Sequence, residues 1–213
     1  MLSQFSECRL FFREYVRSFH TTGAILPSGR WLAAALARYV ASDDGAQKIL
    51  EVGPGTGAVT RRIAAVMRPQ DRLDLVELND TFVAKLRAGL AEEPGLCRIA
   101  DRTRVLHMPI EDLPGEACYD VIVSGLPLNN FRPEEVEQIL GRLVGLLRPG
   151  GTLSFFEYIA IRWMRGMVSR RAERERLRGI ARALNTVLDG HEIRRDWVWP
   201  NVPPAWVHHV RYG

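Results

Sequence analysis

A glycine-rich segment that follows a short apolar run is the part of the sequence best suited to bind a small molecule. Residues 49–57 read ILEVGPGTG. Glycine lets the backbone turn sharply and approach a ligand closely, and a turn between a strand and a helix is where α/β sheets bind ligands. Gly53, Gly55 and Ala58 also fit the dinucleotide pattern G-x-G-x-x-A, so the glycines alone leave the type of ligand open.

Acidic residues around this segment narrow the choice of ligand. Glu51 comes shortly before Gly53, where a carboxylate suits a ligand with a cationic amino-acid head and would repel a pyrophosphate. Glu77 ends the next apolar run, and its oxygens can accept hydrogen bonds from both hydroxyls of a ribose. Glu111 and Asp112 follow the third expected strand, where they either meet an adenine amino group or belong to a solvated loop. These acids predict a ligand that joins adenosine to a cationic amino acid.

The elements expected to position these residues alternate between strand and helix. Expected strands cover residues 48–52, 72–78, 104–108, 119–124 and 152–158, and expected helices cover residues 30–41, 58–67, 81–91, 133–147 and 162–188. Residues 191–197 and 206–212 have the character of two further strands. Repeated strand–helix units with short connections predict an α/β fold, with a parallel sheet covered by helices on both faces.

The N-terminal segment is expected to form an amphipathic helix over residues 4–19. Its aromatic residues share one face, and Arg9, Arg13 and Arg17 line a flank of that face. Such a helix is typical of membrane surfaces, and docking of its apolar stripe on the protein core is the alternative. We therefore divide the chain into residues 1–29, an N-terminal amphipathic helix with a loop that covers the ligand, and residues 30–213, a single domain.

Composition excludes some classes of protein. At 46% hydrophobic residues the chain can bury a substantial core, so disorder is not expected. No apolar run is long enough to span a bilayer, and the N-terminus lacks the pattern of a cleaved secretory signal. Cys8, Cys97 and Cys118 are scattered, so we expect free thiols in a reducing cytoplasm and neither a disulfide framework nor a metal site.

The formal net charge of +4 comes mostly from arginine. Arg170, Arg174, Arg178 and Arg182 recur at every fourth position of an expected helix, and Leu177, Ile180 and Leu184 lie on a different face of it. Like charges at this spacing destabilise an isolated helix by about 0.2–0.5 kcal/mol per pair. The row therefore indicates either a solvated surface or an anionic partner, which a membrane or a nucleic acid would provide.

Four motifs together resemble the class I S-adenosylmethionine-dependent methyltransferases, over about residues 48–158. They are E-x-G-x-G-x-G at 51–57, the strand-end Glu77, the pair Glu111-Asp112, and LLRPGG at 146–151. The resemblance implies a Rossmann-like fold with a seven-stranded, mostly parallel sheet, helices on both faces and a C-terminal antiparallel hairpin. It implies S-adenosyl-L-methionine as the cofactor and no metal. The residues expected at the cofactor are Thr22, Gly23, Ser28, Glu51, Gly53, Gly55, Gly57, Glu77, Leu78, Glu111, Asp112, Ser124, Gly125 and Leu126.

The loop at residues 124–131, SGLPLNNF, faces the methyl acceptor in this class. Enzymes that methylate adenine or amide nitrogens often carry Asn or Asp at its start and an aromatic residue after the proline, where this chain has Ser124 and Leu128. The loop is instead similar to that of bacterial phospholipid N-methyltransferases, as are TGAILPSGR at 22–30, FFEY at 155–158 and NVPPA at 201–205. Their pattern more often has threonine where this chain has Glu157, which leaves the acceptor amine open.

This resemblance implies transfer of methyl groups to the amine of phosphatidylethanolamine or an ornithine lipid. The expected partners are an anionic membrane surface and the amine-bearing lipid, and the expected location is the inner face of the cytoplasmic membrane. Methylation of adenine in ribosomal RNA is the alternative, because the dimethylases of that RNA share E-x-G-P-G-x-G. A nucleotide-binding module without catalysis is disfavoured by the intact Glu51, Glu77 and glycines.

An ammonium must lose a proton before its nitrogen can attack a methyl group, so the enzyme needs a proton acceptor. The candidates for this step are Tyr158, Glu157, Tyr15 and His20, and Asn129 is the candidate that orients the amine. The alternative for each tyrosine is packing, and the alternative for Asn129 is a role in a turn.

Overall fold

The computed structural model describes residues 29–42, 45–159, 171–201 and 203–213. The expected helix at residues 4–19 and the covering loop lie outside these ranges, so both remain predictions. The described strands form one sheet in the order β3-β2-β1-β4-β5-β7-β6. They are β1 (Lys48–Val52), β2 (Arg72–Glu77), β3 (Thr103–His107), β4 (Tyr119–Ser124), β5 (Leu147–Tyr158), β6 (Glu192–Val198) and β7 (Ala205–Arg211).

The sheet has the predicted direction of strands. The neighbours from β3 to β5 pair in parallel, whereas β7 is antiparallel to both β5 and β6. β7 is therefore inserted between β5 and β6, and β6 runs in the same direction as the parallel strands. This arrangement confirms the expected Rossmann-like sheet with a C-terminal hairpin.

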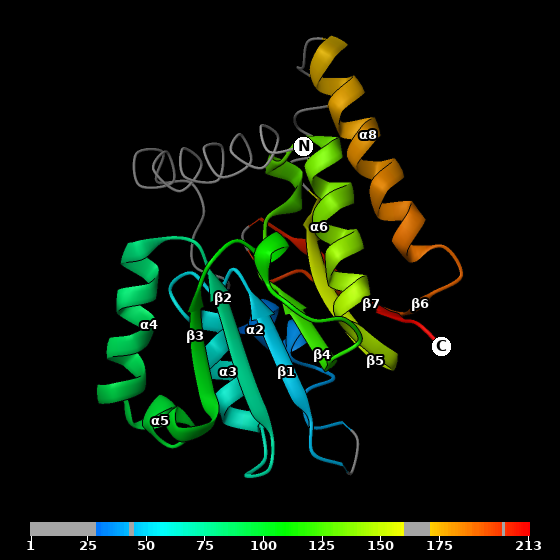
Figure 1. Ribbon diagram of the computed structural model, residues 1–213. Coiled ribbons are helices and arrows are strands. Elements are labelled where there is room, and N and C mark those ends of the chain that lie inside the picture. Colours follow the sequence, from blue (N-terminus) through cyan, green and yellow to red (C-terminus); the bar gives the residue numbers. More distant parts are fainter. Residues whose placement is uncertain (1–28, 43–44, 160–170, 202) are drawn as a thin grey trace.

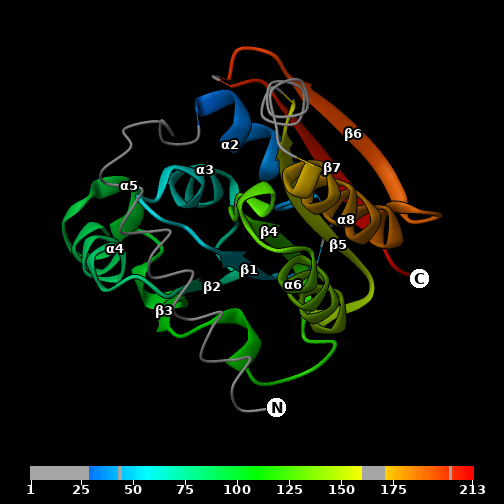
Figure 2. The same ribbon diagram turned by 90° about the horizontal axis from the view of Figure 1, so that it is seen from above.

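Helices cover both faces of the sheet (Figures 1 and 2). They are α2 (Arg30–Leu36), α3 (Ala58–Val66), α4 (Asp80–Glu92), α5 (Pro94–Cys97), α6 (Pro133–Leu146) and α8 (Arg171–Leu188), with short turns η1 (Ala100–Arg102), η2 (Ile110–Asp112) and η3 (Leu128–Asn130). One apolar core joins α2, α3 and α4 to the sheet, and a second joins α6 and α8 to the opposite face. The apolar runs of β1 and β4 contribute to both cores, as expected for central strands.

Several boundaries differ from the prediction. The helix expected at 30–41 ends at Leu36, and Ala41 adopts a positive φ of 59° in the turn that follows. Leu147, expected to end the helix, and residues 148–151, expected to stop it, belong to β5, which pairs with β4 through an irregularity in register. Residues 94–97 form α5, which was not predicted. The first part of the helix expected at 162–188 lies outside the described residues, and α8 is described from Arg171.

A buried polar network ties three parallel strands together. Asp74 on β2 accepts hydrogen bonds from Arg104 on β3 at 2.6 and 2.7 Å and from the Tyr119 hydroxyl on β4 at 2.8 Å. Burial alone would raise the pKa of Asp74, but the bonds from Arg104 and Tyr119 outweigh it and hold the pKa below its usual value. The network therefore stabilises the half of the sheet that carries the glycine-rich loop.

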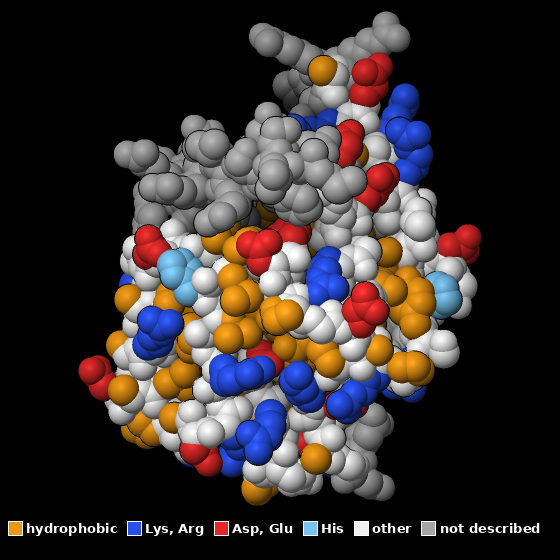
Figure 3. All heavy atoms as spheres, in the orientation of Figure 1, with side chains coloured by type: hydrophobic (Ala, Val, Ile, Leu, Met, Phe, Trp, Pro, Cys, Tyr) orange, Lys and Arg blue, Asp and Glu red, His pale blue; other side chains and the backbone are white. Residues whose placement is uncertain are grey.

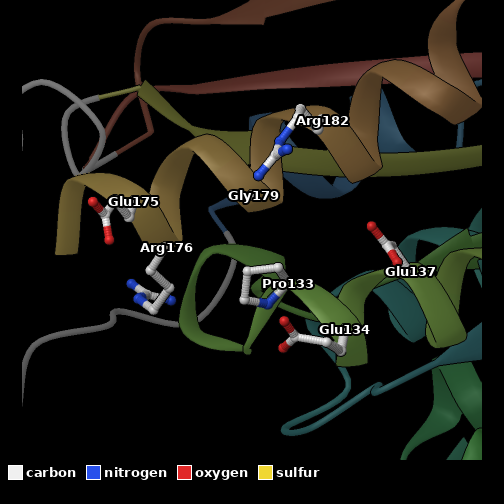
Figure 4. A pocket seen from close by; sticks show the side chains of 7 residues that line it. All are labelled: Pro133, Glu134, Glu137, Glu175, Arg176, Gly179 and Arg182. Carbon is white, nitrogen blue, oxygen red and sulfur yellow. The ribbon is translucent and has the colours of Figure 1, made fainter. Parts of the chain in front are cut away.

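α8 packs through its apolar face and exposes its arginines, as the sequence pattern predicts. Ile180 and Leu184 are buried, whereas Arg174, Arg178 and Arg182 are exposed and Arg170 lies outside the described residues. A groove of about 430 Å³ separates α8 from the start of α6 (Figure 4). It is lined by Pro133, Glu134, Glu137, Glu175, Arg176, Gly179 and Arg182. Carboxylates of α6 thus line the same groove as Arg182.

Candidate active site

The glycine-rich loop lies at the carboxyl end of β1, at the centre of the parallel strands. Gly53, Gly55 and Gly57 adopt positive φ angles of 68°, 55° and 81°, which other residues rarely adopt. A Cβ atom on Gly53 would lie 2.5 Å from the Leu126 side chain, so this glycine is required by packing. A Cβ atom on Gly55 would meet nothing within 4 Å, so the middle of the loop faces open space. That space is where a ligand can approach the backbone.

The loop after β4 packs directly against the loop after β1. The Gly125 amide donates to the Val52 carbonyl at 2.8 Å, and a Cβ atom on Gly125 would lie 2.6 Å from the Gly53 carbonyl oxygen. Ser124 is fully buried, and its hydroxyl accepts a bond from the Leu126 amide at 3.4 Å. The expected cofactor residues of β1 and β4 are therefore brought together at one edge of the sheet.

Glu77 ends β2 beside this loop and organises its backbone. One carboxyl oxygen accepts the amides of Leu78 and Asn79 at 2.9 and 2.8 Å, and the other accepts the Gly55 amide at 3.0 Å. Burial raises the pKa of Glu77, and these three amide bonds oppose the rise. A carboxylate has about four acceptor positions, so Glu77 retains room for a ribose hydroxyl while it holds Gly55 in place.

Glu51 lies inside the sheet on β1, without exposure to solvent. Both of its carboxyl oxygens are buried and lack a hydrogen bond of good geometry within the described part of the chain. Burial raises the pKa of Glu51 to about 8, although the nearby hydroxyl and amide of Thr60 oppose the rise. A buried carboxyl without a partner is the group that a cationic ligand would satisfy.

The ends of β2 and β3 lie side by side, at the place where the adenine end of the site is expected. Glu111 and Asp112 lie in the turn η2 after β3. The sequence reasoning missed His107, which pairs with Glu77 in strand register and whose Nε2 lies 3.1 Å from the Leu78 carbonyl oxygen. Its place at the end of the strand next to β2 was the signal that could have found it.

Tyr158 and Glu157, the two candidates on β5, point to opposite faces of the sheet. Tyr158 is buried in the core shared with α2 and α3, 4.9 Å from the Phe156 ring between ring centres. Glu157 lies beside His208, whose ring stacks on Phe155 of the other core. Because side chains alternate along a strand, Tyr158 and Glu157 cannot both contact the nitrogen that accepts the methyl group from the same side of the sheet.

Glu157 belongs to a row of titratable side chains across β5, β7 and β6. One of its oxygens lies 3.9 Å from His208 Nε2, and His208 Nδ1 lies 2.7 Å from a Glu192 oxygen. Arg195 donates to the same Glu192 carboxylate at 2.7 and 3.0 Å. Burial lowers the pKa of His208, so its ring is neutral at pH 7 despite the adjacent carboxylates. Sequence reasoning missed this row because it depends on the pairing of distant strands.

Asn129 lies in η3 and is nearly fully buried. Its side-chain amide donates to the Tyr158 carbonyl at 3.4 Å, and its own carbonyl accepts a bond from Arg176 of α8 at 3.0 Å. The loop after β4 is therefore held against the end of β5 and the start of α8. Asn129 is well placed at the acceptor end, and its role toward an amine remains a prediction.

Asn201, which belongs to the NVPPA motif at residues 201–205, also lies at this end of the sheet. Its side-chain oxygen accepts the Gly29 amide at 3.1 Å, and its amide group donates to the Pro203 carbonyl at 2.8 Å. Asn201 thus connects the start of the described chain to the loop between β6 and β7. The candidates Tyr15, His20, Thr22, Gly23 and Ser28 lie outside the described residues.

Comparisons with known proteins identify the class. Residues 49–151 match the family model of the methyltransferase domain. The chain is 29% identical over 146 residues to the ornithine lipid N-methyltransferase of Singulisphaera acidiphila, covering 68% of this chain and 74% of that enzyme. It is 36% identical over 122 residues to ribosomal RNA small subunit methyltransferase A of Parasynechococcus marenigrum, covering 55% of this chain and 37% of that enzyme.

Solved methyltransferase structures share the fold. A putative O-methyltransferase from Klebsiella pneumoniae has a TM-score of 0.63 at 16% identity, covering 95% of this chain and 90% of that one. The O-methyltransferase TomG from Streptomyces achromogenes, solved in complex with S-adenosylmethionine, has a TM-score of 0.60 at 19% identity, covering 86% and 79%. The fold, the glycine-rich loop and the family match define the chain as an S-adenosylmethionine-dependent methyltransferase.

The residues of the site fit S-adenosylmethionine. The open space at Gly55 leaves room for the ligand, Glu77 retains acceptor capacity for a ribose, and Glu51 offers a buried carboxyl to a cation. Within the described ranges, no group of three or more histidine, cysteine or acidic side chains is arranged to hold a metal ion. No helix of the described chain is long and apolar enough to cross a bilayer.

Proposed function

We propose that this enzyme transfers methyl groups to the amine of a membrane lipid head group, such as phosphatidylethanolamine or an ornithine lipid. The observation that carries the proposal is the burial of the acceptor loop. Leu128 and Phe131 are 1% and 2% exposed and pack in the core shared with α6 and α8. Neither side chain can serve as a platform on which a nucleobase stacks. The polar side chain of the loop is Asn129, which lies against the Tyr158 carbonyl at the end of β5 and whose side-chain oxygen is of the kind that accepts from an amine.

The similarity to a lipid methyltransferase supports the same conclusion. The alignment with the ornithine lipid enzyme runs through 74% of its length, whereas the ribosomal RNA enzyme is matched over 37% of its length. This chain therefore spans most of the lipid enzyme and less than half of the RNA enzyme. Ribosomal RNA methylation is the second candidate, because the RNA relative has the higher identity over the matched part.

When bound, the cofactor supplies a methyl group on a positively charged sulfur, which is already reactive. The protein must then position the amine, exclude water and accept its proton. We propose that Asn129 orients the amine and that Glu157 accepts the proton of the amine. His208 and Glu192 would then pass this proton on toward the surface of the protein. Tyr158, on the opposite face of β5, then serves by shaping the end of the strand. Tyr15 and His20 remain proposed contributors from the N-terminal segment.

We also propose that the enzyme works on the inner face of the cytoplasmic membrane, with the segment at residues 4–19 as an anchor. An arginine near an anionic surface contributes about 1 kcal/mol, so Arg9, Arg13 and Arg17 together contribute about a hundredfold in binding. Changing all three to glutamate should strongly reduce flotation with anionic vesicles and should spare cofactor binding. If the triple variant floats as well as the wild type, the segment at residues 4–19 is not the membrane anchor.

The function is tested by incubating the protein with cofactor labelled on its methyl group, together with bacterial membranes or ribosomal RNA in separate tubes. We expect label in the lipid extract and none in RNA. Label confined to RNA would overturn the proposal in favour of the second candidate. A Glu77→Ala variant should bind the cofactor poorly and is the control. Label that still appears with this variant does not come from transfer at this site.

A further inference from the structure

Tryptophan side chains are unusually exposed at one corner of the molecule. Trp31, Trp197 and Trp199 are 51%, 55% and 65% exposed, although large aromatic side chains are normally buried. The Trp197 ring lies 4.9 Å from Trp199 and 5.1 Å from Trp206, between ring centres. The rings of Trp197, Trp199 and Trp206 are tilted against one another and form a cluster at the surface instead of filling the core.

All four of these tryptophans lie at the carboxyl end of the parallel strands, the end that carries the cofactor loop. Trp199 directly follows β6, and Trp206 lies near the start of β7, opposite Trp197 in register. Trp31 lies at the start of α2, which the Gly29–Asn201 bond fastens to the loop between β6 and β7 (Figure 2). We call Trp31, Trp197, Trp199 and Trp206 the tryptophan rim.

Arginines at the same end of the sheet are partly unpaired, although the carboxylates of Glu134 and Glu175 lie near the start of α8 as well. Arg30 lies over the Trp31 ring at 4.9 Å and has no ion pair within the described chain. Arg174 and Arg178 are exposed near the start of α8, and the described residues give them no acidic partner. The first turns of α8 lie at this end because Arg176 donates to the Asn129 carbonyl after β4. Arg195, beside Trp206, is neutralised by Glu192.

The opposite end of the sheet is also rich in basic side chains, but it carries no exposed tryptophan among the described residues. Figure 3 shows lysines and arginines gathered in its lower part, below the amino ends of the strands. There Arg104 pairs with Asp74, and Arg148 pairs with Asp120. Exposed tryptophan and unpaired arginine therefore coincide at the carboxyl end.

We propose that the tryptophan rim, together with Arg30, Arg174 and Arg178, is a docking surface for an anionic lipid bilayer. Tryptophan prefers the boundary between lipid head groups and acyl chains, because its ring is apolar and its N–H remains hydrated. Unpaired arginines at the same level attract lipid phosphates. The inference rests on the proposed function, since it would place the end of the sheet that receives the amine at the level of the head groups.

The test is flotation of the full-length protein with vesicles of phosphatidylglycerol and phosphatidylethanolamine, compared with vesicles of phosphatidylcholine. The double variant Trp197→Ser/Trp199→Ser should bind the anionic vesicles about tenfold less tightly or worse, because two large apolar surfaces no longer enter the interface. Ile193→Ser is the matched control, since Ile193 is 45% exposed on β6 at the far end of that strand. It should bind like the wild type.

Retained binding of S-adenosylhomocysteine shows that each variant is folded, and Arg174→Glu/Arg178→Glu provides an independent second variant. That charge variant should lose binding to anionic vesicles and change little on neutral ones. Unchanged flotation of both double variants would overturn the rim as a docking surface, even if lipid is methylated. A loss of self-association in place of vesicle binding, seen by light scattering, would overturn it in favour of a dimer interface. Failure of lipid methylation with intact rim-dependent binding would instead refute the proposed function alone.

Discussion

The buried carboxyl of Glu51 predicts an unusual dependence of stability on pH. Its pKa is about 8 in the folded, cofactor-free protein, against an ordinary value of 4.5. The folded state therefore holds the proton more tightly than the unfolded state between these values. The stability that this group contributes is fully present below pH 4.5 and is lost as the pH rises toward 8. The difference in pKa corresponds to about 5 kcal/mol.

Glu51→Gln isolates this effect, because glutamine resembles the protonated acid and does not titrate. We expect the free energy of unfolding of the variant, relative to the wild type, to rise by about 4 kcal/mol between pH 4.5 and 8. Urea unfolding of the cofactor-free proteins across this range measures the difference. Glu92→Gln, on the exposed side of α4, is the control and should follow the wild type.

Glu51→Gln should also weaken the binding of S-adenosylmethionine. A cation beside Glu51 favours its ionised form, so binding to the wild type should release a proton near pH 7 and should tighten as the pH rises to 8. Calorimetry in buffers with different heats of ionisation detects the released proton, which the glutamine variant should lack. A difference in stability that stays flat across the pH range would refute the assignment of a neutral, buried Glu51.

Four further changes test other parts of the structure. Glu77→Ala should weaken cofactor binding by at least tenfold, because each bond to a charged acceptor contributes about 1.5–3 kcal/mol, and calorimetry showing an unchanged dissociation constant would refute the ribose assignment. Gly55→Val should fill the open space of the loop and abolish S-adenosylhomocysteine binding; normal binding by a folded variant would show that the ligand lies elsewhere. Tyr158→Phe keeps the ring that packs at the end of β5, so turnover and cofactor affinity should stay close to those of the wild type, whereas a turnover lowered more than the affinity would assign the hydroxyl a direct role. Tyr119→Phe should lower the free energy of unfolding by about 1–3 kcal/mol in urea and leave cofactor affinity unchanged, whereas undiminished stability would make the Asp74 network dispensable.

Local patterns predicted the strands and helices because most of them bury an uninterrupted apolar run or stripe. The boundaries that failed depend on contacts between distant residues. The helix beginning at Arg30 was expected to continue to residue 41, but the Ala41 amide donates to the Gln47 side chain at 2.6 Å in a turn with positive φ. Residues 148–151 are predicted as a break because of their proline and glycines, yet they belong to β5, whose first residue, Leu147, pairs with Tyr119 across the sheet.

The sequence predicted which residues belong to the candidate site, but it predicted fewer of the contacts between them. The spacing of the glycines and Glu77 placed them at one edge, and the structure brings them within hydrogen-bond distance through the Gly55 amide. Glu157 and Tyr158 are neighbours in an expected strand, so alternation of side chains alone implies that they face opposite sides of the sheet. The partners His208 and Glu192 required the order of strands, which a single sequence does not specify.

The claim that the methyl group goes to a lipid amine is tested most directly with purified protein and defined vesicles. One set contains phosphatidylethanolamine or an ornithine lipid, and the matched set contains the same lipid with its amine acylated. We predict that S-adenosylhomocysteine forms only with the free amine, in amounts equal to the methyl groups found on the lipid by mass spectrometry. Equal formation with both sets, or methylation of ribosomal RNA while both lipids stay unmodified, would contradict the claim.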